Sequence, residues 1–358
     1  MKGVEDVARK AIGIRDVARE AGVSVTTVSH ILNDVESARA SEETRERVRE
    51  TAARLGYGAN RIARSLRRQQ TEMIGFISEE IATTPHAGRI ILGAQEAARI
   101  HGLTLVVINT VRESSDLSKD IRTLLDQQVD GILFATMFHR EVSLPETLLT
   151  VPTVLIDARD SDGRIPSAIP DEVGGAKAAV SELVSAGHSR IAFLNNRDDV
   201  PATRLRLQAY REVLAEAGIP VDESLIVDEL SESAGGYRAG KQLLERSDRP
   251  TAVFCYNDRM AMGAYRAAAE LRLEIPRDLS VVGFDNQEII AEGLYPPLTT
   301  VALPHYEMGA WAVNTLVDLL AGRESELLLA SHPVLLSCPL VRRDSVQAPP
   351  RVADPSAA

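Results

Sequence analysis

Residues 12–68 decide the fold, and they read IGIRDVAREAGVSVTTVSHILNDVESARASEETRERVRETAARLGYGANRIARSLRR. The first ten of them predict a short helix, because apolar residues recur at helical spacing at Ile14, Val17, Ala18 and Ala21. Gly22 follows directly, and glycine can end a helix in the left-handed conformation at little energetic cost. The stretch therefore opens with a helix and a tight turn.

A second helix is predicted over about 25–33, with Ser24 as its cap. Its inward face would carry Val28, Ile31 and Leu32. Its outward face would then present small and polar side chains, as a helix-turn-helix requires to enter a major groove: Val25, Thr26, Ser29 and His30. A third helix should begin at Ser41 and bury Val48, Ala52 and Leu55. A small solvated three-helix bundle is the alternative interpretation of the first segment alone.

Three segments in fixed order, GVSVTTVSHILN, TRERVRETAARLGY and NRIARSL, closely resemble the DNA-binding headpiece of the LacI/GalR family of bacterial transcription regulators. The resemblance implies a homodimer that binds a near-palindromic operator in double-stranded DNA. Val25, Thr26 and His30 would read base edges, while Thr27, Ser29 and Asn33 would contact phosphates or make supporting contacts. The remaining residues implied to bind DNA are Tyr57, Asn60, Ala63 and Leu66.

The hinge is expected at residues 60–67, as a short helix that forms only when two subunits meet on DNA. Leu66 resembles the family leucine that wedges into the minor groove and kinks it. A minor packing role is the alternative for this leucine. Ala59 stands where the family usually has a proline, so the start of the hinge helix should be less fixed.

Charge is divided unevenly along the chain. Residues 1–70 hold 14 Lys/Arg against 10 Asp/Glu, a net of 14 − 10 = +4, and the whole chain carries −11, which leaves −15 for the rest. Attraction to phosphate should therefore be confined to the headpiece. The first eleven residues contain no apolar signal core and no run reaches transmembrane length, so we expect a cytoplasmic protein that associates with the nucleoid when bound to its operator.

From Met73 onward, short apolar runs alternate with helical patterns in two successive series. Near-continuous apolar strands separated by helices indicate parallel sheets covered on both faces. The fold class expected is therefore α/β: a three-helix headpiece and hinge, followed by a two-lobed core of doubly wound sheets that resembles periplasmic binding proteins. A last strand is expected near PVLLSC.

The expected boundaries follow from these patterns. They are a headpiece at 12–57, a linker at 58–71, a core at 72–345 and a disordered tail at 346–358. Within the core, lobe 1 should span about 72–160 with part of 299–335, and lobe 2 about 171–298 with the C-terminal strand.

Nearly every predicted strand ends in a hydrogen-bonding side chain, and ligands of open α/β sheets bind beyond the carboxyl ends of the strands. One such residue would mean little, because turns are polar. Together they suit a polyhydroxylated ligand between the lobes. The family resemblance implies that Arg206 reaches the effector, with Arg204 as the alternative. The full set expected at the effector is Ser78, Pro85, His86, Asp157, Asn195, Arg206, Asn257 and Asp285.

Two departures from the family pattern concern this cleft. His86 replaces a ring that could stack on a sugar, and Ala209 stands where glycine is usual. A sugar is the expected effector, and a nucleoside or purine is the alternative, because His86 and the arginine could serve a base. The sequence does not decide between inducer and corepressor.

Motifs for catalysis are missing from the sequence. It has no G-x-S-x-G, phosphate loop, H-E-x-x-H or Cys/His cluster, so we expect no enzyme, no cofactor and no metal site. Cys255 lies inside the apolar run AVFCY and is expected to be a buried thiol. A sugar-binding component of a transporter is the rival for the core, and the headpiece argues against it. We therefore predict an effector-controlled transcription regulator, with a repressor favoured.

Overall fold

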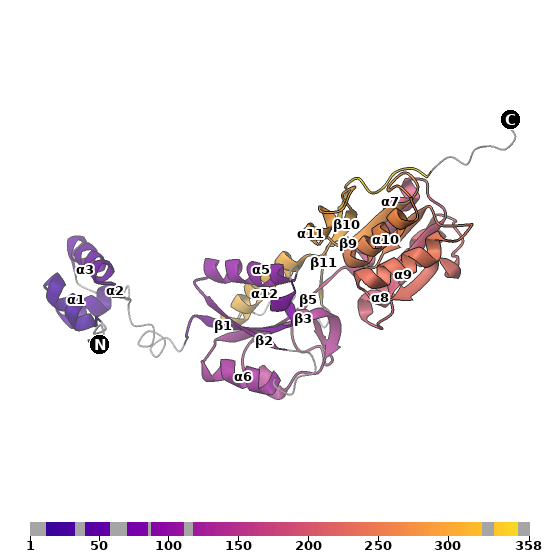
Figure 1. Cartoon of the computed structure of the whole chain (residues 1–358). Coiled ribbons are helices and arrows are strands. Elements are labelled where there is room, and N and C mark those ends of the chain that lie inside the picture. The colour runs from indigo at the N-terminus through magenta and orange to yellow at the C-terminus, as the bar shows by residue number, and fades with distance from the viewer. Residues whose placement is uncertain are drawn as a thin grey trace, which may run out of the picture. The chain divides into compact units, whose positions relative to one another are not determined.

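The computed structural model describes residues 12–32, 40–57, 70–84, 87–110, 117–323 and 333–349 (Figure 1). By its contacts the chain divides into two compact units, residues 1–73 and 74–358. The predictions made above for Asn33, Ala59, Asn60, Ala63, Leu66, Pro85 and His86 lie outside the described residues.

The headpiece has the three predicted helices, α1 (Ile14–Ala21), α2 (Val25–Leu32) and α3 (Glu42–Leu55). Gly22 ends α1 in the left-handed conformation, at φ 68°. Ser24 caps α2, because its Oγ accepts a hydrogen bond from the Thr27 amide at 3.0 Å, and Ser41 caps α3 in the same way. The three helices enclose a small core of Val17, Ala18, Ala21, Val28, Ile31, Val48 and Ala52.

Lobe 1 is built on a six-stranded sheet of order β11-β5-β4-β3-β1-β2. Its strands are β1 (Met73–Glu79), β2 (Thr104–Thr110), β3 (Gly131–Val142), β4 (Thr153–Asp160), β5 (Ser167–Pro170) and β11 (Val334–Leu336). Helices α5 (Gly88–Ile100) and α12 (His305–Leu320) pack together on one face, and α6 (Leu117–Asp126) lies on the other (Figure 1). Successive residues of β1 face opposite sides: Phe76 packs in the core with α12, whereas a Cβ on Gly75 would meet Leu124 of α6.

Lobe 2 repeats this plan with a sheet of order β12-β10-β9-β8-β6-β7. Its strands are β6 (Ile191–Asn196), β7 (Ile226–Glu229), β8 (Ala252–Cys255), β9 (Ser280–Asp285), β10 (Thr299–Ala302) and β12 (Leu340–Val341). Helices α7 (Glu172–Ser185) and α8 (Pro201–Glu216) pack against each other, as do α9 (Ser233–Leu244) and α10 (Asp258–Glu270). Gly263 permits the second pairing, because a Cβ there would lie 2.2 Å from the Ser233 carbonyl oxygen. Short elements complete the described chain: η1 (Ile81–Thr83), η2 (Glu146–Thr150), η3 (Glu223–Leu225) and α11 (Glu288–Ala291).

The end of the chain differs from the prediction. The strand within PVLLSC does not complete lobe 2: Val334–Leu336 pairs in parallel with β5 and belongs to the sheet of lobe 1. Lobe 2 is closed instead by the short β12, which pairs antiparallel with β10. Neither β5 nor β10 was predicted, because runs of four residues carry too little pattern to stand out. Lobe 1 therefore takes strands from both ends of the core.

The chain crosses between the lobes three times, after β5, after β10 and after β11. Each crossing leaves from the carboxyl end of a strand, so these ends face the space between the lobes. Cys255 and Cys338 are buried free thiols, as predicted for Cys255, and burial raises the pKa of both. Among the described residues, no helix is both long enough and apolar enough to cross a membrane.

Candidate effector cleft and DNA-reading helix

A cavity of about 750 Å³ lies at the carboxyl ends of the strands, lined by residues of both lobes. Four of the eight predicted effector residues line it: Asp157 from within β4, Arg206 from α8, Asn257 at the start of α10 and Asp285 from the end of β9. Residues far apart in the sequence are thus brought to one site. Their contact with an effector stays a prediction.

Ser78 and Asn195 also stand at strand ends, but they are not among the residues that line the cavity. Ser78 is fully buried, donates to Asn109 Oδ1 at 2.9 Å and accepts from the Ala82 amide at 2.9 Å. The Asn195 amide donates to Asp228 Oδ1 at 3.0 Å. Both side chains therefore hold the strand ends together from within.

Arg206 is the most tightly held charged group at the cavity. Its side chain is 4% exposed, and Nε donates to Glu172 Oε2 at 2.7 Å. Nη1 donates to the Tyr256 carbonyl oxygen and lies 3.9 Å from Asp285 Oδ1. The guanidinium carbon stands 3.6 Å from the centroid of the Phe284 ring, a cation–π contact. These contacts fix the arginine in one orientation.

The two aspartates of the cavity have unusual backbones. Asp157 has φ 54° and Asp285 has φ 103°, in the left-handed region that residues with a Cβ seldom adopt. Such conformations persist where the surroundings hold them, and they cluster at functional sites. Burial, with the nearby charge of Glu172, raises the pKa of Asp157 well above its usual range. Its Oδ1 is buried and has no hydrogen-bond partner in the part of the chain that is described.

Asn257 is held by the backbone on both sides of its amide. Its Oδ1 accepts from the Met260 amide at 2.9 Å and so caps α10. Its Nδ2 donates to the Ser231 carbonyl oxygen at 3.0 Å. The residue that follows, Asp258, is fully buried and accepts from Thr300 Oγ1 at 2.5 Å and the Gln287 amide at 2.6 Å. This turn is therefore rigid.

Sequence reasoning missed most of the residues that line the cavity, among them Glu172, His139 and Tyr256. Glu172 opens α7, where an acidic residue is expected merely to favour the helix N-terminus. His139 lies in β3 beyond the predicted end of that strand, so no pattern pointed to it. Burial, assisted by Arg159, lowers the pKa of His139 to about 4, and its Nδ1 has no described partner.

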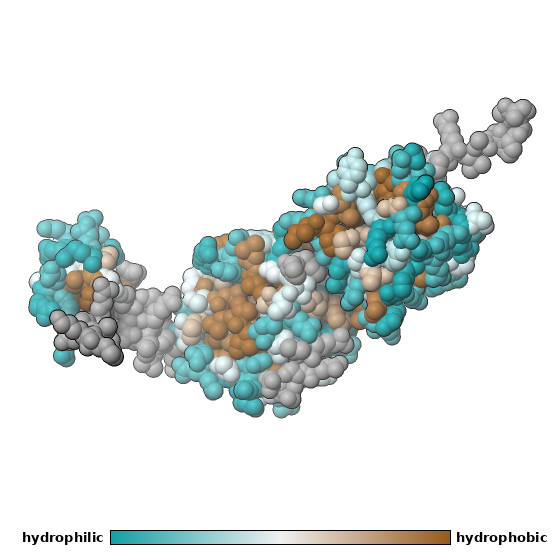
Figure 2. All heavy atoms as spheres, viewed as in Figure 1, coloured by the Kyte–Doolittle hydropathy of each residue, from teal (hydrophilic) through white to brown (hydrophobic). Residues whose placement is uncertain are grey.

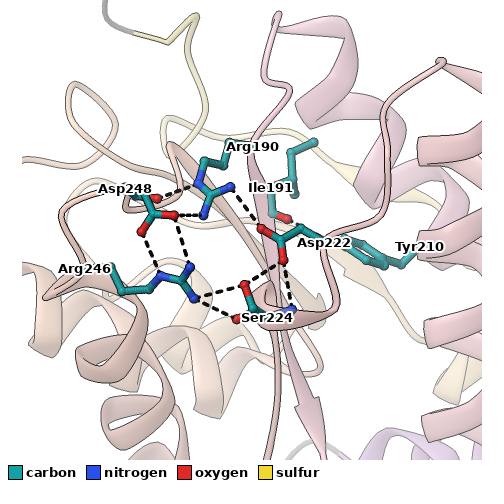
Figure 3. A network of polar contacts seen from close by, with 7 residues as sticks. All are labelled: Arg190, Ile191, Tyr210, Asp222, Ser224, Arg246 and Asp248. Atoms are coloured by element: carbon teal, nitrogen blue, oxygen red, sulfur yellow. Dashed lines mark hydrogen bonds and ion pairs between the residues drawn. The ribbon is translucent and has the colours of Figure 1, made fainter.

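A second polar cluster in lobe 2 provides a contrast (Figure 3). Arg190 bridges Asp222 at 3.1 Å and Asp248 at 2.6 Å, and Arg246 bonds Asp248 and Ser224. These residues precede β6, β7 and β8, at the amino ends of the strands and away from the cavity. Each charge faces a partner within the cluster, so we interpret it as a tie between loops.

In the headpiece, α2 turns the predicted side chains outward. Val25 is 41% exposed and Thr26 is exposed, while Thr27, Ser29 and His30 are partly exposed. The Thr27 hydroxyl lies 2.8 Å from the Ser24 hydroxyl, so it also takes part in the helix cap. Tyr57 packs partly buried against the headpiece core. The outward start of α2 has the character that entry into a major groove demands.

A helix-turn-helix headpiece carried by a two-lobed core with a polar cavity defines a ligand-controlled DNA-binding regulator. Residues 13–60 match the family model "Bacterial regulatory proteins, lacI family", and residues 180–346 match "Periplasmic binding protein-like domain". The chain belongs to the lacI family of bacterial regulatory proteins, as the relatives below establish, and it is a DNA-binding transcriptional regulator.

Two curated relatives match over most of their length. The HTH-type transcriptional regulator RegA of Clostridium saccharobutylicum is 33% identical, covering 94% of this chain and 99% of that protein. The ribose operon repressor of Escherichia coli K12 is 34% identical, covering 85% and 92%. Among solved structures, the lac repressor dimer bound to operator and the anti-inducer ONPF is 28% identical, covers 95% of this chain and 100% of that one, and has a TM-score of 0.77.

Proposed function

We propose that this regulator is a homodimeric repressor whose operator affinity is set by a sugar bound between the lobes. One observation carries the proposal: a buried carboxyl oxygen of Asp157, which has no hydrogen-bond partner among the described residues, lies at a polar cavity that Arg206 and Asp285 also line. An unpaired buried polar atom is costly, and a ligand hydroxyl would satisfy it. The ribose operon repressor, which the chain resembles, is named for a sugar system.

Recognition of DNA is proposed for the start of α2. Val25, Thr26 and His30 would contact base edges, and Thr27 and Ser29 would position the helix on the backbone. Tyr57 would support this surface from its place against the headpiece core. We extend the same proposal to Asn33, Asn60, Ala63 and Leu66, from the family resemblance of their segments. Pro85 and His86 likewise stay proposed for the effector wall.

Control would come from the three segments that cross between the lobes. A ligand that touches Asp157 in lobe 1 and Asp285 in lobe 2 interacts differently with each arrangement of the lobes. It shifts the population only by that difference in affinity. Arg89 of α5 and Glu288 of α11 form an exposed ion pair across the lobes at 2.7 Å, which adds a weak, salt-sensitive bias.

The surface proposed for the dimer is an apolar face of lobe 1. Leu92 and Ile100 of α5 are 46% and 82% exposed, and Val107 of the edge strand β2 is 41% exposed. Figure 2 shows apolar residues gathered on this face of lobe 1, near α5 and β2. Large exposed apolar patches mark interaction sites. We place the dimer in the cytoplasm, associated with the nucleoid when bound to its operator, and assign it no catalysis.

The experiment starts from the full chain. Its binding sites are selected from random double-stranded DNA, and operator affinity is then measured by fluorescence anisotropy with and without individual sugars. We expect a near-palindromic consensus, steep loss of affinity with salt, and a change in affinity with at least one sugar. A chain that selects no consensus, or whose operator affinity no sugar changes, contradicts the proposal.

A further inference from the structure

The charge of Arg206 is already compensated within the protein. Its side chain and that of Glu172 are each 4% exposed, and the two are joined by the 2.7 Å hydrogen bond from Nε to Oε2. The Tyr256 carbonyl oxygen accepts a hydrogen bond from Arg206 Nη1. The guanidinium carbon lies 3.6 Å from the centroid of the Phe284 ring and 4.5 Å from that of the Tyr256 ring. The arginine can thus donate to a ligand, but it has little net charge with which to attract an anion.

The floor of the cavity is acidic beyond this pair. Asp285 Oδ1 lies 3.9 Å from Arg206 Nη1, and the buried Asp157 adds a third carboxyl group to the lining of the cavity. Across all described residues that line the cavity, six are Asp or Glu and three are Arg. The remaining charged residues of the lining do not reverse the balance, because they are two arginines, Arg197 and Arg259, and three acidic residues, Glu80, Asp198 and Asp199.

Two hydrogen-bonding atoms of the cavity lack partners among the described residues, Asp157 Oδ1 and His139 Nδ1. The raised pKa of Asp157 favours its protonated form, which can donate as well as accept. The lowered pKa of His139 keeps its ring neutral near pH 7. A hydroxyl can both donate and accept, so it can satisfy either atom, whereas a phosphate at that pH is mainly an acceptor that brings negative charge.

We propose that this cavity selects uncharged or cationic polyols and rejects phosphorylated and carboxylated ones, with Glu172 as the residue that sets the selectivity. The inference rests on the proposed function and narrows its ligand class. Glu172 acts as a positioning residue, because it holds Arg206 in place and compensates its charge. The selectivity is thus built from an unfavourable interaction with the wrong ligand as well as from favourable ones.

The test is calorimetry on the full chain with matched pairs: D-ribose and D-ribose 5-phosphate, D-glucose and D-glucose 6-phosphate, adenosine and AMP. D-glucosamine provides the cationic probe. We expect a neutral member to bind at least tenfold more tightly than its phosphate, and glucosamine to bind no more weakly than glucose. A phosphorylated ligand that binds as tightly as its neutral counterpart overturns the proposed selectivity but does not contradict the proposed function. If only the nucleoside pair binds, the proposed sugar ligand is wrong. The affinity ratio of adenosine to AMP then still tests the proposed selectivity against phosphorylated ligands. If nothing binds, both proposals fall.

The variant Glu172→Gln releases the charge of Arg206 while keeping a hydrogen-bonding side chain. We expect its neutral-to-phosphate affinity ratio to fall at least tenfold. Glu182→Gln is the matched control, since Glu182 lies on the same helix and pairs with the exposed Arg342, at 2.8 Å. The ratio should stay at the wild-type value in this control. If Glu172→Gln does not fold, Asp285→Asn removes one charge from the same floor, and an unchanged ratio there overturns the proposal.

Discussion

Asp157 and Asp285 face one cavity from different lobes, and both hold their backbones in the left-handed region, at φ 54° and 103°. Asp157 lies within β4 of lobe 1, three residues before that strand ends, and Asp285 ends β9 of lobe 2. The sheet of each lobe therefore delivers one carboxyl group to the cavity. A ligand held by both is sensitive to how the lobes are arranged.

The first prediction concerns Asp285. Asp285→Ala should weaken binding of the sugar that responds in the calorimetric panel by about 10- to 100-fold, the loss expected for hydrogen bonds to a charged group. Operator affinity without sugar should stay near the wild-type value, because the headpiece is untouched. Anisotropy titrations with and without the sugar provide the measurement. Asp318→Ala, which removes an exposed carboxylate paired with Arg323, is the control. Equal sugar responses in the Asp285 variant and wild type would contradict the cleft assignment.

Base reading should map to the exposed start of α2. Thr26→Ala and His30→Ala should each change preference at particular operator positions, by roughly 1–3 kcal/mol where a good bidentate contact is lost. Site selection from random DNA compares the consensus of each variant with that of wild type. Ala53→Ser, on the exposed side of α3, should leave the consensus unchanged. Identical consensus sequences for all proteins would remove α2 from base recognition.

Acid should weaken lobe 2 through His188. This ring is 2% exposed, contacts Thr251 Oγ1 at 2.8 Å and the Gln347 carbonyl oxygen at 2.9 Å, and burial lowers its pKa. In the folded state the His188 ring therefore stays neutral, whereas in the unfolded chain it takes up a proton below about pH 6.5. The stabilisation is complete above that pH and is lost as the pH falls towards the lowered folded pKa.

Urea denaturation at pH 7.5 and 5.5 measures this effect. At pH 7.5 the free energy of unfolding of His188→Gln should be about 1–3 kcal/mol lower than that of wild type, because the variant loses buried hydrogen bonds. It should then lose less on acidification than wild type does, since its titrating group is gone. Equal losses in the two proteins would show that His188 does not carry the pH dependence.

A charged residue introduced on the apolar face of lobe 1 should disrupt the proposed dimer. Ile100→Asp, placed at a side chain that is 82% exposed, should shift the protein from dimer to monomer and lower operator affinity. The folded lobe should tolerate the change, because the side chain is mostly in solvent. Sedimentation velocity gives the oligomeric state. Arg122→Asp on α6, which lies on the other face of the sheet, is the control. A variant that sediments as wild type would place the interface elsewhere.

Local chemistry explains which features were predictable. The cap Ser24 and the turn at Gly22 depend on neighbouring residues, and the structure confirms both. The third helix begins at Glu42, one residue later than predicted, with Ser41 as its cap. The strand end at Asp285 followed from an apolar run that stops at a polar residue, whereas β4 continues past the predicted end at Asp157 to Asp160. Glu172 was not predictable, because its partner Arg206 is 34 residues away and only the packing of α7 on α8 joins them. The placement of Val334–Leu336 in lobe 1 likewise depends on a pairing with β5 that no local pattern encodes.

The return of the chain to lobe 1 through α12 and β11 has a consequence for synthesis on the ribosome. The headpiece is complete by residue 57, but lobe 1 requires Met308 and Leu316 for its core and Val334–Leu336 for its sheet. A translating chain therefore emerges with a finished DNA-binding unit ahead of a core that stays open until residues 334–336 have been added. A message truncated before codon 305 would yield headpieces without either the cavity or a closed lobe 1, and such products are targets for proteolysis.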